Sequence, residues 1–450
     1  MNDTIAAIST SLGVGAISII RVSGNESIQI ANKIFKGKDL TKVESHTINY
    51  GYIIENEKII DEVLVSVMKS PKTFTTEDIV EINCHGGIAT TKKILELLLI
   101  NGCRLAEPGE FTKRAFLNGR IDLIEAEGIM DLIDSKTVAR RSLAINQVSG
   151  EVSKLIHDLR KDIIEVISHI EVNIDYPEYE DVKELETKEV LPLINNVKNK
   201  LNTIIKNSEN SKIIKNGIKT VIIGKPNVGK SSILNTLLEE EKAIVTDIPG
   251  TTRDIVEGTI NIDGILLNII DTAGIRETED IVEKIGVNKS LELIDEAELV
   301  INVLNNNEIL TEKEKELISK IKEKPHVIIL NKIDLENKCD IDSLTDNYIK
   351  MSIKENIGIN ELKNEIRKLF NLEEITTNDI NYLVNSRSLA ILKQCRNTLE
   401  EININIDNEF PIDMIEIDLK EIWNLLGKII GETYEEELLD ELFSRFCLGK

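Results

Sequence analysis

The chain has 450 residues, 41% of them hydrophobic, and this length suggests about three domains, each with its own apolar core. Its formal net charge of −24 excludes a surface that broadly attracts nucleic acid or anionic membranes. Any contact with RNA must therefore be local, or be made through a partner protein.

The cysteine pattern and the first residues indicate a cytoplasmic protein. The cysteines are odd in number and contain no C-x-x-C pair, so we expect neither a disulfide framework nor a zinc site. The first basic residue is Arg21, and no basic stretch of a secretory signal precedes it. The apolar run 94–100 is too short to span a bilayer, so we expect no membrane association.

Residues 1–118 are predicted to form a mixed α+β domain. Alternating or continuous apolar stretches predict strands at 16–22, 59–68 and 78–84, and a helix at 90–100 that Asn101 and Gly102 close. The dipeptide Pro108-Gly109 is a turn signal, and we expect another short helix to begin there.

Residues 119–213 have the periodicity of helices. Apolar residues recur at helix spacing over 121–133, over 148–174 and again over 191–205. The acidic segment 175–181 contains Pro177 and interrupts this pattern, so we expect a loop there.

Residues 214–370 alternate strands with helices, which predicts a mostly parallel, doubly wound sheet. The expected strands are 219–223, 258–262, 265–270, 299–304, 327–330 and 348–352. A helical pattern of apolar residues returns from residue 379 onward and is interrupted at Pro411. We therefore expect an α/β and α+β multidomain chain, in which residues 214–370 are inserted into a helical domain formed by 119–213 and 371–450.

A glycine-rich loop follows the first strand of this inserted domain. Residues 224–231 read Gly-Lys-Pro-Asn-Val-Gly-Lys-Ser, the G-x-x-x-x-G-K-S pattern of a P-loop. Backbone N–H groups of such a loop converge on phosphates, and the following helix start favours anions. Lys230 would then reach the β- and γ-phosphates, and Ser231 would hold Mg²⁺.

Guanine selectivity is predicted by the sequence Asn331-Lys332-Ile333-Asp334, which follows an apolar strand. A carboxylate at Asp334 can accept the N1–H and the exocyclic amine of guanine, whereas adenine has no matching pair of donors. The segment Met351-Ser352-Ile353-Lys354 fits the later loop that contacts the base, with isoleucine where alanine is usual.

The two switch segments of a GTPase are also recognisable. Asp271-Thr272-Ala273-Gly274 would orient the Mg²⁺ shell and contact the γ-phosphate, and Thr252 would bind Mg²⁺. Ile275 stands where Ras-like enzymes carry the glutamine that orients water, and isoleucine cannot form that hydrogen bond. Another group must position the water, and nearby acidic residues could do so or could be solvated surface.

Over its whole length the chain resembles the tRNA modification GTPase MnmE (TrmE) family. The resemblance rests on the P-loop, on Thr246-Asp247-Ile248-Pro249-Gly250-Thr251-Thr252-Arg253-Asp254, and on Asp271-Thr272-Ala273-Gly274-Ile275-Arg276. Outside the GTPase segment it rests on 108–119, Pro-Gly-Glu-Phe-Thr-Lys-Arg-Ala-Phe-Leu-Asn-Gly, and on the terminal Phe446-Cys447-Leu448-Gly449-Lys450. It implies a folate-binding and dimerisation domain at 1–118 and a Ras-like GTPase domain inserted into the helical domain.

The resemblance also implies how hydrolysis is catalysed. Glu283, in Glu283-Lys284-Ile285-Gly286, matches the acidic residue that orients water, and it becomes the catalytic candidate. K⁺ would be held by Asn227, Thr246, Ile248 and Thr251, and Mg²⁺ by Ser231 and Thr252. A cation beside the β- and γ-phosphates can do the work of an arginine finger. The predicted GTP contacts are Asn227, Val228, Gly229, Lys230, Ser231, Ser232, Thr246, Asp247, Ile248, Pro249, Gly250, Thr251, Thr252, Asp271, Thr272, Ala273, Gly274, Asn331, Lys332 and Asp334.

For folate the resemblance points to Arg21, Glu81, Arg120 and Lys450. The tail of a tetrahydrofolate carries carboxylates, and its pterin edge presents an amine and an N–H that Glu81 could accept. Without the family, Arg21 and Glu81 would be taken for ordinary charges at strand ends. Cys447 is a candidate active-site residue, although a free cysteine near a chain end more often packs as a small apolar group.

The function that the resemblance implies is joint action with a flavoprotein similar to MnmG (GidA). The pair would form 5-carboxymethylaminomethyl or aminomethyl uridine at the tRNA wobble position. A 5-formyl or methylene tetrahydrofolate would supply the carbon, glycine or ammonium the amine, and FAD on the partner the redox step. The chain would be a homodimer and would contact tRNA mainly through the partner.

Two other classes of protein remain alternatives on the sequence alone. One is a regulatory or ribosome-assembly GTPase of the Era or Der type, but those carry basic RNA-binding appendages, whereas the segments here are acidic. The other is a stand-alone folate-dependent aminomethyltransferase with an incidental GTPase domain.

Overall fold

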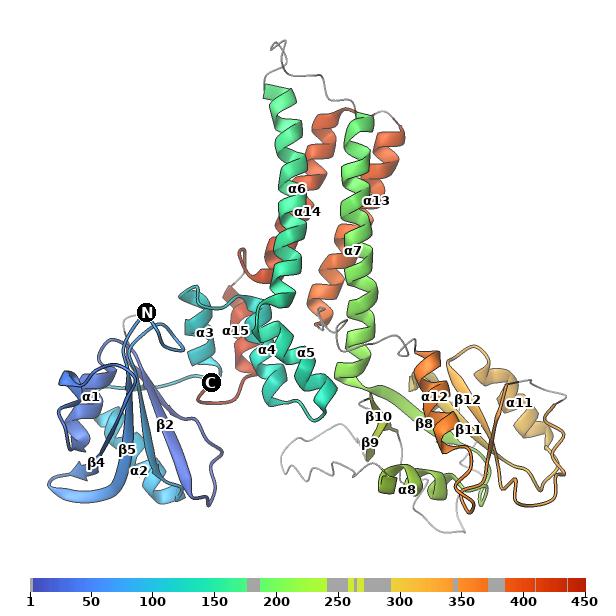
Figure 1. The fold of residues 1–450 in the computed structure, drawn as a ribbon, viewed down its shortest axis with the longest axis horizontal. Coiled ribbons are helices and arrows are strands. Elements are labelled where there is room, and N and C mark those ends of the chain that lie inside the picture. Colours follow the sequence, from blue (N-terminus) through green and yellow to red (C-terminus); the bar gives the residue numbers. More distant parts are fainter. Residues whose placement is uncertain are drawn as a thin grey trace. The chain divides into compact units, whose positions relative to one another are not determined.

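The computed structural model divides the chain into two compact units. It describes residues 3–175, 187–240, 258–262, 265–270, 293–342, 347–370, 385–408, 410–434 and 436–450. The first unit comprises Met1–Met130, Val148–Thr187 and Asn405–Lys450, and the second comprises Asp131–Gln147 and Lys188–Ile404 (Figure 1). Both units mix helices with a sheet, so the prediction of an α/β and α+β multidomain chain is confirmed.

The first unit contains a seven-stranded sheet in the order β3-β4-β5-β6-β2-β1-β7. Its strands are β1 (Ile5–Ile8), β2 (Ile17–Ser23), β3 (Phe35–Lys36), β4 (Thr47–Glu55), β5 (Lys58–Met68), β6 (Ile79–His85) and β7 (Arg104–Leu105). Neighbouring strands are antiparallel except β1 and β7. The three strands and the helix predicted for 1–118 are present, within two residues at each end.

One face of this sheet packs against α1 (Ser27–Ile34) and α2 (Ile88–Ile100). A short 3₁₀ turn, Leu40–Lys42, lies between β3 and β4. β4 was missed from the sequence because Asn49 and Gly51 occupy its buried face. A Cβ at Gly51 would lie 2.5 Å from the Lys36 carbonyl oxygen, so only glycine allows this approach to β3.

The helices of the first unit gather the chain's C-terminal residues against its N-terminal domain. They are α3 (Glu110–Leu117), most of α4 (Leu123–Ile133), α6 (Glu151–Asp175), α14 (Ile412–Ile430) and α15 (Glu436–Ser444). Phe116 of α3, Leu123 of α4 and Phe443 of α15 share one buried cluster. Along α14, Lys420 forms an ion pair with Glu171 of α6 at 2.8 Å. The loop expected at 175–181 lies outside the described residues, except for Asp175.

The second unit contains a six-stranded sheet in the order β13-β12-β11-β8-β10-β9. Its strands are β8 (Ile218–Ile223), β9 (Gly258–Ile262), β10 (Ile265–Ile269), β11 (Leu299–Asn305), β12 (His326–Asn331) and β13 (Ile349–Met351). Its helices are α5 (Val138–Val148), α7 (Thr187–Asn216), α8 (Lys230–Glu240), α11 (Glu312–Ile321), α12 (Ile359–Leu369) and most of α13 (Ser386–Asp407). All strand pairs are parallel except β9 with β10, as the sequence predicts for 214–370.

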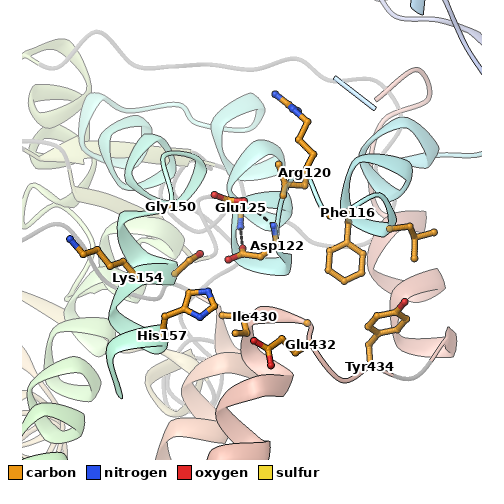
Figure 2. Close-up of a pocket in the computed structure, with 15 residues that line it drawn as sticks. Phe116, Arg120, Asp122, Glu125, Gly150, Lys154, His157, Ile430, Glu432 and Tyr434 are labelled. Carbon is orange, nitrogen blue, oxygen red and sulfur yellow. Dashed lines mark hydrogen bonds between the residues drawn. The ribbon is translucent and has the colours of Figure 1, made fainter. Parts of the chain in front are cut away.

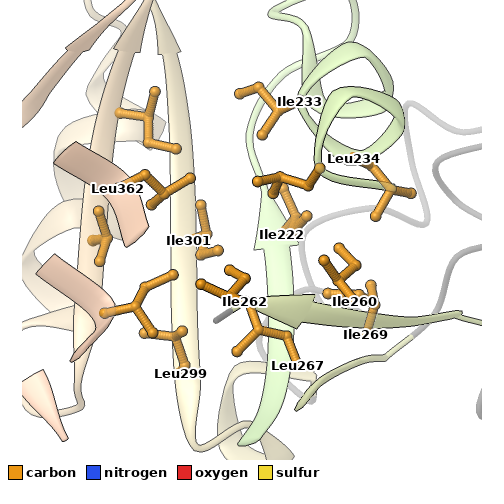
Figure 3. Packing of buried hydrophobic residues seen from close by; sticks show 14 of the residues in the cluster. Ile222, Ile233, Leu234, Ile260, Ile262, Leu267, Ile269, Leu299, Ile301 and Leu362 are labelled. Carbon is orange, nitrogen blue, oxygen red and sulfur yellow. The ribbon is translucent and has the colours of Figure 1, made fainter. Parts of the chain in front are cut away.

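Apolar side chains fill both faces of this sheet. On one face Ile222 of β8, Ile301 of β11 and Leu362 of α12 belong to one buried cluster (Figure 3). The other face packs Val300 and Leu304 against α11. Central strands buried on both faces read as continuous apolar runs, which is why these strands were found from the sequence. The domain boundaries at 118, 213 and 370 stay predictions.

Among the helices in the described ranges, none has the length and apolar character that a bilayer crossing requires.

Candidate functional site

The P-loop motif forms a tight turn between β8 and α8. Gly224 has φ +143° and Gly229 φ +106°, values that L side chains rarely adopt. A Cβ at Gly224 would lie 2.3 Å from the carbonyl oxygen of Val303 in β11. Asn227 also has a positive φ, 60°, a conformation that asparagine tolerates better than most residues. The loop is therefore set by its backbone, and its residue types follow from that geometry.

Lys230 folds back over this loop. Its ammonium donates to the carbonyl oxygens of Gly224 at 2.8 Å and Lys225 at 2.6 Å. Burial lowers the pKa of Lys230 because the protein interior disfavours its charged form. A phosphate bound in the curve of the loop would restore that charge, which suits the role predicted for this lysine. Ser231 and Ser232 follow it in the first turn of α8.

The predicted base-recognition residues lie against the same loop. The Asn331 side chain is buried and donates to the Val228 carbonyl oxygen at 2.8 Å. A Cβ at Gly229 would lie 2.2 Å from the Asn331 amide nitrogen, so this approach requires glycine. Lys332 donates to the Asn227 carbonyl oxygen at 2.7 Å. The structure thus brings residues 227–232 together with 331–332.

Asp334 is oriented by the later loop. Its carboxylate accepts a 2.8 Å hydrogen bond from the hydroxyl of Ser352, which is itself fully buried. One Asp334 oxygen is therefore held in place. Ser352 belongs to the Ser352-Ile353-Lys354 segment, whose position beside the base was expected from the sequence.

An ion pair beneath the P-loop was not predicted. Lys225 contacts Glu314 at 2.6 Å, and Glu314 also accepts the backbone N–H of Thr311 at 2.9 Å. Glu314 is the third residue of α11 and closes its capping box with Thr311. The pair ties the outer arc of the loop to α11. In sequence, Lys225 reads as a variable loop position, so only the fold reveals this tie.

The remaining predicted nucleotide and cation residues, Thr246–Thr252, Asp271–Gly274 and Glu283, lie outside the described residues.

A second cluster lies in the first unit, where Arg21 of β2 faces Glu81 of β6. The two residues are register partners in adjacent strands, and Arg21 Nη2 lies 2.8 Å from Glu81 Oε1. The Arg21 guanidinium is 5.7 Å from the ring centres of both Phe74 and Phe111. Glu81 thus stands beside a cation that is packed between aromatic rings.

Arg120 and Lys450 join this cluster at the ring of Phe74. The Arg120 guanidinium lies 5.0 Å from the ring centre and donates to the Phe74 carbonyl oxygen at 3.0 Å. Lys450 Nζ lies 6.0 Å from the same ring centre. Burial, and next the charge of Arg21, lower the pKa of Lys450. Three of the four predicted folate residues, Arg21, Arg120 and Lys450, therefore lie around one ring that sequence reasoning missed, and the fourth, Glu81, is paired with Arg21.

Backbone hydrogen bonds hold the C-terminal tail in this cluster. The N–H groups of Gly109 and Phe111 donate to the carbonyl oxygens of Cys447 and Lys450, at 3.4 and 3.2 Å. Gly449 has φ +89°, and a Cβ there would lie 2.4 Å from the Ile8 carbonyl oxygen. Cys447 is exposed. The Pro108-Gly109 motif and the terminal motif are therefore two halves of one contact.

A buried ion network supports the loop that carries Phe74. Arg114 is 1% exposed and pairs with Glu110 at 3.0 Å and Glu77 at 3.1 Å. Glu77 accepts a 2.7 Å hydrogen bond from Ser23 of β2. Asn118, at the end of α3, donates to the Thr75 carbonyl oxygen at 2.7 Å. The loop 71–78 borders a cavity of about 560 Å³ that Phe74 and Arg120 also line.

Comparison with known proteins identifies the family of this chain. The model described as "MnmE helical domain" matches residues 123–447, and the one described as "GTP-binding protein TrmE N-terminus" matches residues 4–120. The chain belongs to the tRNA modification GTPase MnmE family. The resemblance drawn from the motifs is therefore confirmed.

Individual relatives within the MnmE family cover the whole chain. The tRNA modification GTPase MnmE of Bacillus cytotoxicus is 52% identical over 455 residues, which cover 100% of this chain and 99% of the relative. That of Bacillus subtilis is 51% identical over 458 residues, with full coverage of both chains.

Among solved structures, the FeoB G domain from Methanococcus jannaschii aligns with 34% of this chain and 98% of its own length at 25% identity, with a TM-score of 0.25.

Proposed function

We propose that this MnmE-family GTPase is stimulated by K⁺ and modifies the wobble uridine of tRNA together with a flavoprotein resembling MnmG. The modification is a 5-carboxymethylaminomethyl or aminomethyl group, its carbon comes from a tetrahydrofolate, and the partner carries FAD. GTPase activity in tRNA modification follows from membership of the family. The observation that carries the finer proposal is the arrangement of Arg21, Arg120 and Lys450 around Phe74, with Glu81 paired to Arg21.

The chemistry of this cluster suits a reduced folate. Three cations, Arg21, Arg120 and Lys450, lie within 6.0 Å of one aromatic ring centre, which is a favourable setting for an anionic, flat ligand. Arginine and lysine can pair with the carboxylates of the folate tail. Glu81 can accept the amine and N–H of a pterin edge, much as Asp334 is proposed to accept those of guanine.

The geometry of the P-loop supports the proposal of Mg²⁺ and K⁺ as cofactors. Lys230 and Ser231 follow the loop where the β- and γ-phosphates and Mg²⁺ are expected. Asn227, the proposed K⁺ ligand, lies within this loop with a positive φ. Glu283 is proposed to orient the attacking water in place of the glutamine that Ile275 replaces.

An exposed apolar sheet face supports the proposal of a homodimer. Tyr50 of β4 and Leu64 of β5 lie directly opposite each other and are 57% and 47% exposed. Ile48 and Ile17 extend the same face, at 69% and 64% exposure. A large exposed apolar patch is typical of a surface that another protein covers. Arg21 and Ile17 occupy the same face of β2, so a second copy would lie near the folate cluster.

The deciding experiment is nucleoside analysis of tRNA from a strain that lacks this gene. We expect the 5-aminomethyl-type modifications of the wobble uridine to disappear and to return with the wild-type gene. A gene encoding Arg21→Ala should fail to restore them, whereas Lys72→Ala, which removes a cation that lines the cavity beside Phe74, should succeed. If the modifications persist in the deletion strain, the proposal is wrong. Loss of ribosome assembly with normal tRNA would instead favour an Era- or Der-type GTPase.

A further inference from the structure

The ion pair between Lys225 of the P-loop and Glu314 of α11 places two opposite charges beside the nucleotide site. Lys225 Nζ lies 2.6 Å from Glu314 Oε2. Glu314 is only 8% exposed, so its carboxylate is nearly out of contact with water. Removal of one partner from such a pair leaves a charge that water screens poorly. The pair therefore determines how much charge this part of the loop carries.

The cap of α11 does not by itself account for the pair. Glu314 Oε2 also accepts hydrogen bonds from the N–H of Thr311 at 2.9 Å and from its hydroxyl at 2.7 Å. These contacts belong to the capping box at the start of the helix. The ammonium of Lys225 is a further donor to the same oxygen, and a capping box does not need it. The contact with Lys225 must therefore be explained by the P-loop.

Lys225 is one of two cations on this short loop. The other, Lys230, donates to the carbonyl oxygens of Gly224 and Lys225, at 2.8 and 2.6 Å. The backbone of Lys225 thus accepts one ammonium, while its own side chain ends in another. Like charges on one loop repel each other, and the carboxylate of Glu314 offsets one of them. Lys230 then remains as the cation that can pair with the phosphates.

The charge of Lys225 is close enough to influence what the loop binds. Lys225 precedes Asn227, the proposed K⁺ ligand, by two residues, and consecutive Cα atoms are about 3.8 Å apart. The loop is also tightly packed, since a Cβ at Gly224 would lie 2.3 Å from the Val303 carbonyl oxygen. An uncompensated unit charge about 10 Å from a charged ligand changes its affinity by roughly two- to fifteenfold, for effective dielectric constants between about 80 and 20.

We propose that Glu314 is a positioning residue of the GTPase site. By pairing with Lys225 it neutralises the outer arc of the P-loop, and it thereby sets the electrostatic potential in which the β- and γ-phosphates and K⁺ bind. The part that concerns K⁺ rests on the proposed function, in which Asn227 is a K⁺ ligand. The part that concerns the phosphates needs only the GTPase activity of the family.

A purely mechanical tie between the loop and α11 would have different consequences. Breaking the tie from either side would loosen the same loop, so Glu314→Gln and Lys225→Met would both weaken nucleotide binding. Neutralisation has opposite consequences for the two substitutions. Glu314→Gln leaves a positive charge beside the phosphates, whereas Lys225→Met leaves a negative one.

The test is the affinity of the full-length protein for fluorescent GDP with Mg²⁺, measured at constant low ionic strength to limit screening. We expect Glu314→Gln to bind GDP roughly two- to fifteenfold more tightly, and Lys225→Met to bind it more weakly by a similar factor. The double variant should return close to the wild-type affinity. The K⁺ concentration that gives half-maximal GTP hydrolysis should rise in Glu314→Gln and fall in Lys225→Met.

Two controls separate the effect of charge from that of structure. Thr311→Ala removes the hydroxyl that donates to Glu314 but no charge, so its GDP affinity should stay near the wild-type value. Glu432→Gln breaks an ion pair with Arg160 beside a cavity of the first unit (Figure 2), and it should change neither quantity. Thermal unfolding of each variant reports whether the fold is intact.

The outcomes distinguish this inference from the proposed function. If GDP affinity moves in the same direction in both folded single variants, or in neither, Glu314 does not act through the charge of Lys225. The same holds if Thr311→Ala reproduces the effect of Glu314→Gln. Opposite shifts in GDP affinity, together with a wild-type rate that is independent of K⁺, would support Glu314 and refute the proposed K⁺ site. K⁺ stimulation with unchanged GDP affinities would do the reverse.

Discussion

Lys450 carries a positive charge where its surroundings disfavour it. The side chain is half buried near Phe74, and the guanidinium of Arg21 adds a second positive charge. Both effects lower the pKa of Lys450, and only the weaker influence of Cys447 and Glu81 opposes them. An anionic ligand would relieve this repulsion, so Lys450 is well suited to bind one.

We predict that folate affinity falls as the pH rises through the lowered pKa of Lys450, below the pH at which an ordinary lysine would titrate. The neutral amine that forms above the lowered pKa of Lys450 cannot pair with a carboxylate. Lys450→Arg should remove this dependence, because arginine stays protonated over the whole range. Calorimetric titration with 5-formyltetrahydrofolate at several pH values measures it. An affinity that is constant with pH in the wild type would contradict the role of Lys450.

Glu283 is predicted to be needed for hydrolysis and not for binding. Ile275 cannot hold water, so Glu283→Ala should slow GTP hydrolysis by at least about 10²-fold, the lower scale for a group that assists proton transfer. GTP affinity should stay near the wild-type value because the phosphate and base contacts are intact. Single-turnover hydrolysis and fluorescent-nucleotide binding measure the two quantities. Glu279→Ala is the matched control. Near-normal turnover of Glu283→Ala would show that Glu283 is an ordinary solvated surface residue.

At the scale of elements, α3 connects the loop 71–78 with the C-terminal tail. Its buried Arg114 reaches Glu77 in the loop 71–78, its first turn receives the C-terminal tail, and Asn118 at its end holds Thr75. Breaking a buried ion pair by removing one partner typically costs 3–5 kcal/mol. The Pro108–Gly119 motif is therefore explained by packing around the proposed folate cluster.

We predict that deletion of Cys447–Lys450 weakens folate binding and leaves GTP hydrolysis intact. The tail supplies Lys450, and loss of a charge-assisted hydrogen bond costs about 1.5–3 kcal/mol. Folate affinity should therefore fall by roughly 10- to 150-fold. Folate titration and hydrolysis measured in K⁺ test the two parts separately. Normal folate binding would exclude the tail from the pocket, and lost hydrolysis would mean that the tail mainly supports the fold.

At the scale of the whole molecule, hydrolysis is predicted to need Mg²⁺ and to rise with K⁺ but not with Na⁺. A K⁺ held by Asn227 and the segment Thr246–Thr251 would complete the charge around the phosphates. Na⁺ is smaller and prefers shorter distances to oxygen, so a site of K⁺ size binds it poorly. Steady-state hydrolysis in matched K⁺ and Na⁺ buffers, repeated with Asn227→Ala, measures the effect. Equal rates in the two salts would rule out a K⁺ site.

The sequence alone determined those parts of this protein that are encoded by residues next to one another along the chain. The P-loop, the Asn331–Asp334 motif and the buried strands were all predicted, since each is a short segment whose backbone or burial dictates its residue types. Strands with polar or glycine positions, such as β4, were missed because their pattern depends on what packs against them.

Only the tertiary structure decided which charged residues of the first unit lie together. Arg21, Phe74, Glu81, Arg120 and Lys450 are scattered over the chain, and each alone reads as an ordinary strand-end, loop or terminal residue. The sheet register places Arg21 beside Glu81, and backbone bonds from α3 place the tail. Such contacts join residues hundreds of positions apart, so no local pattern encodes them and only the packed fold brings them together.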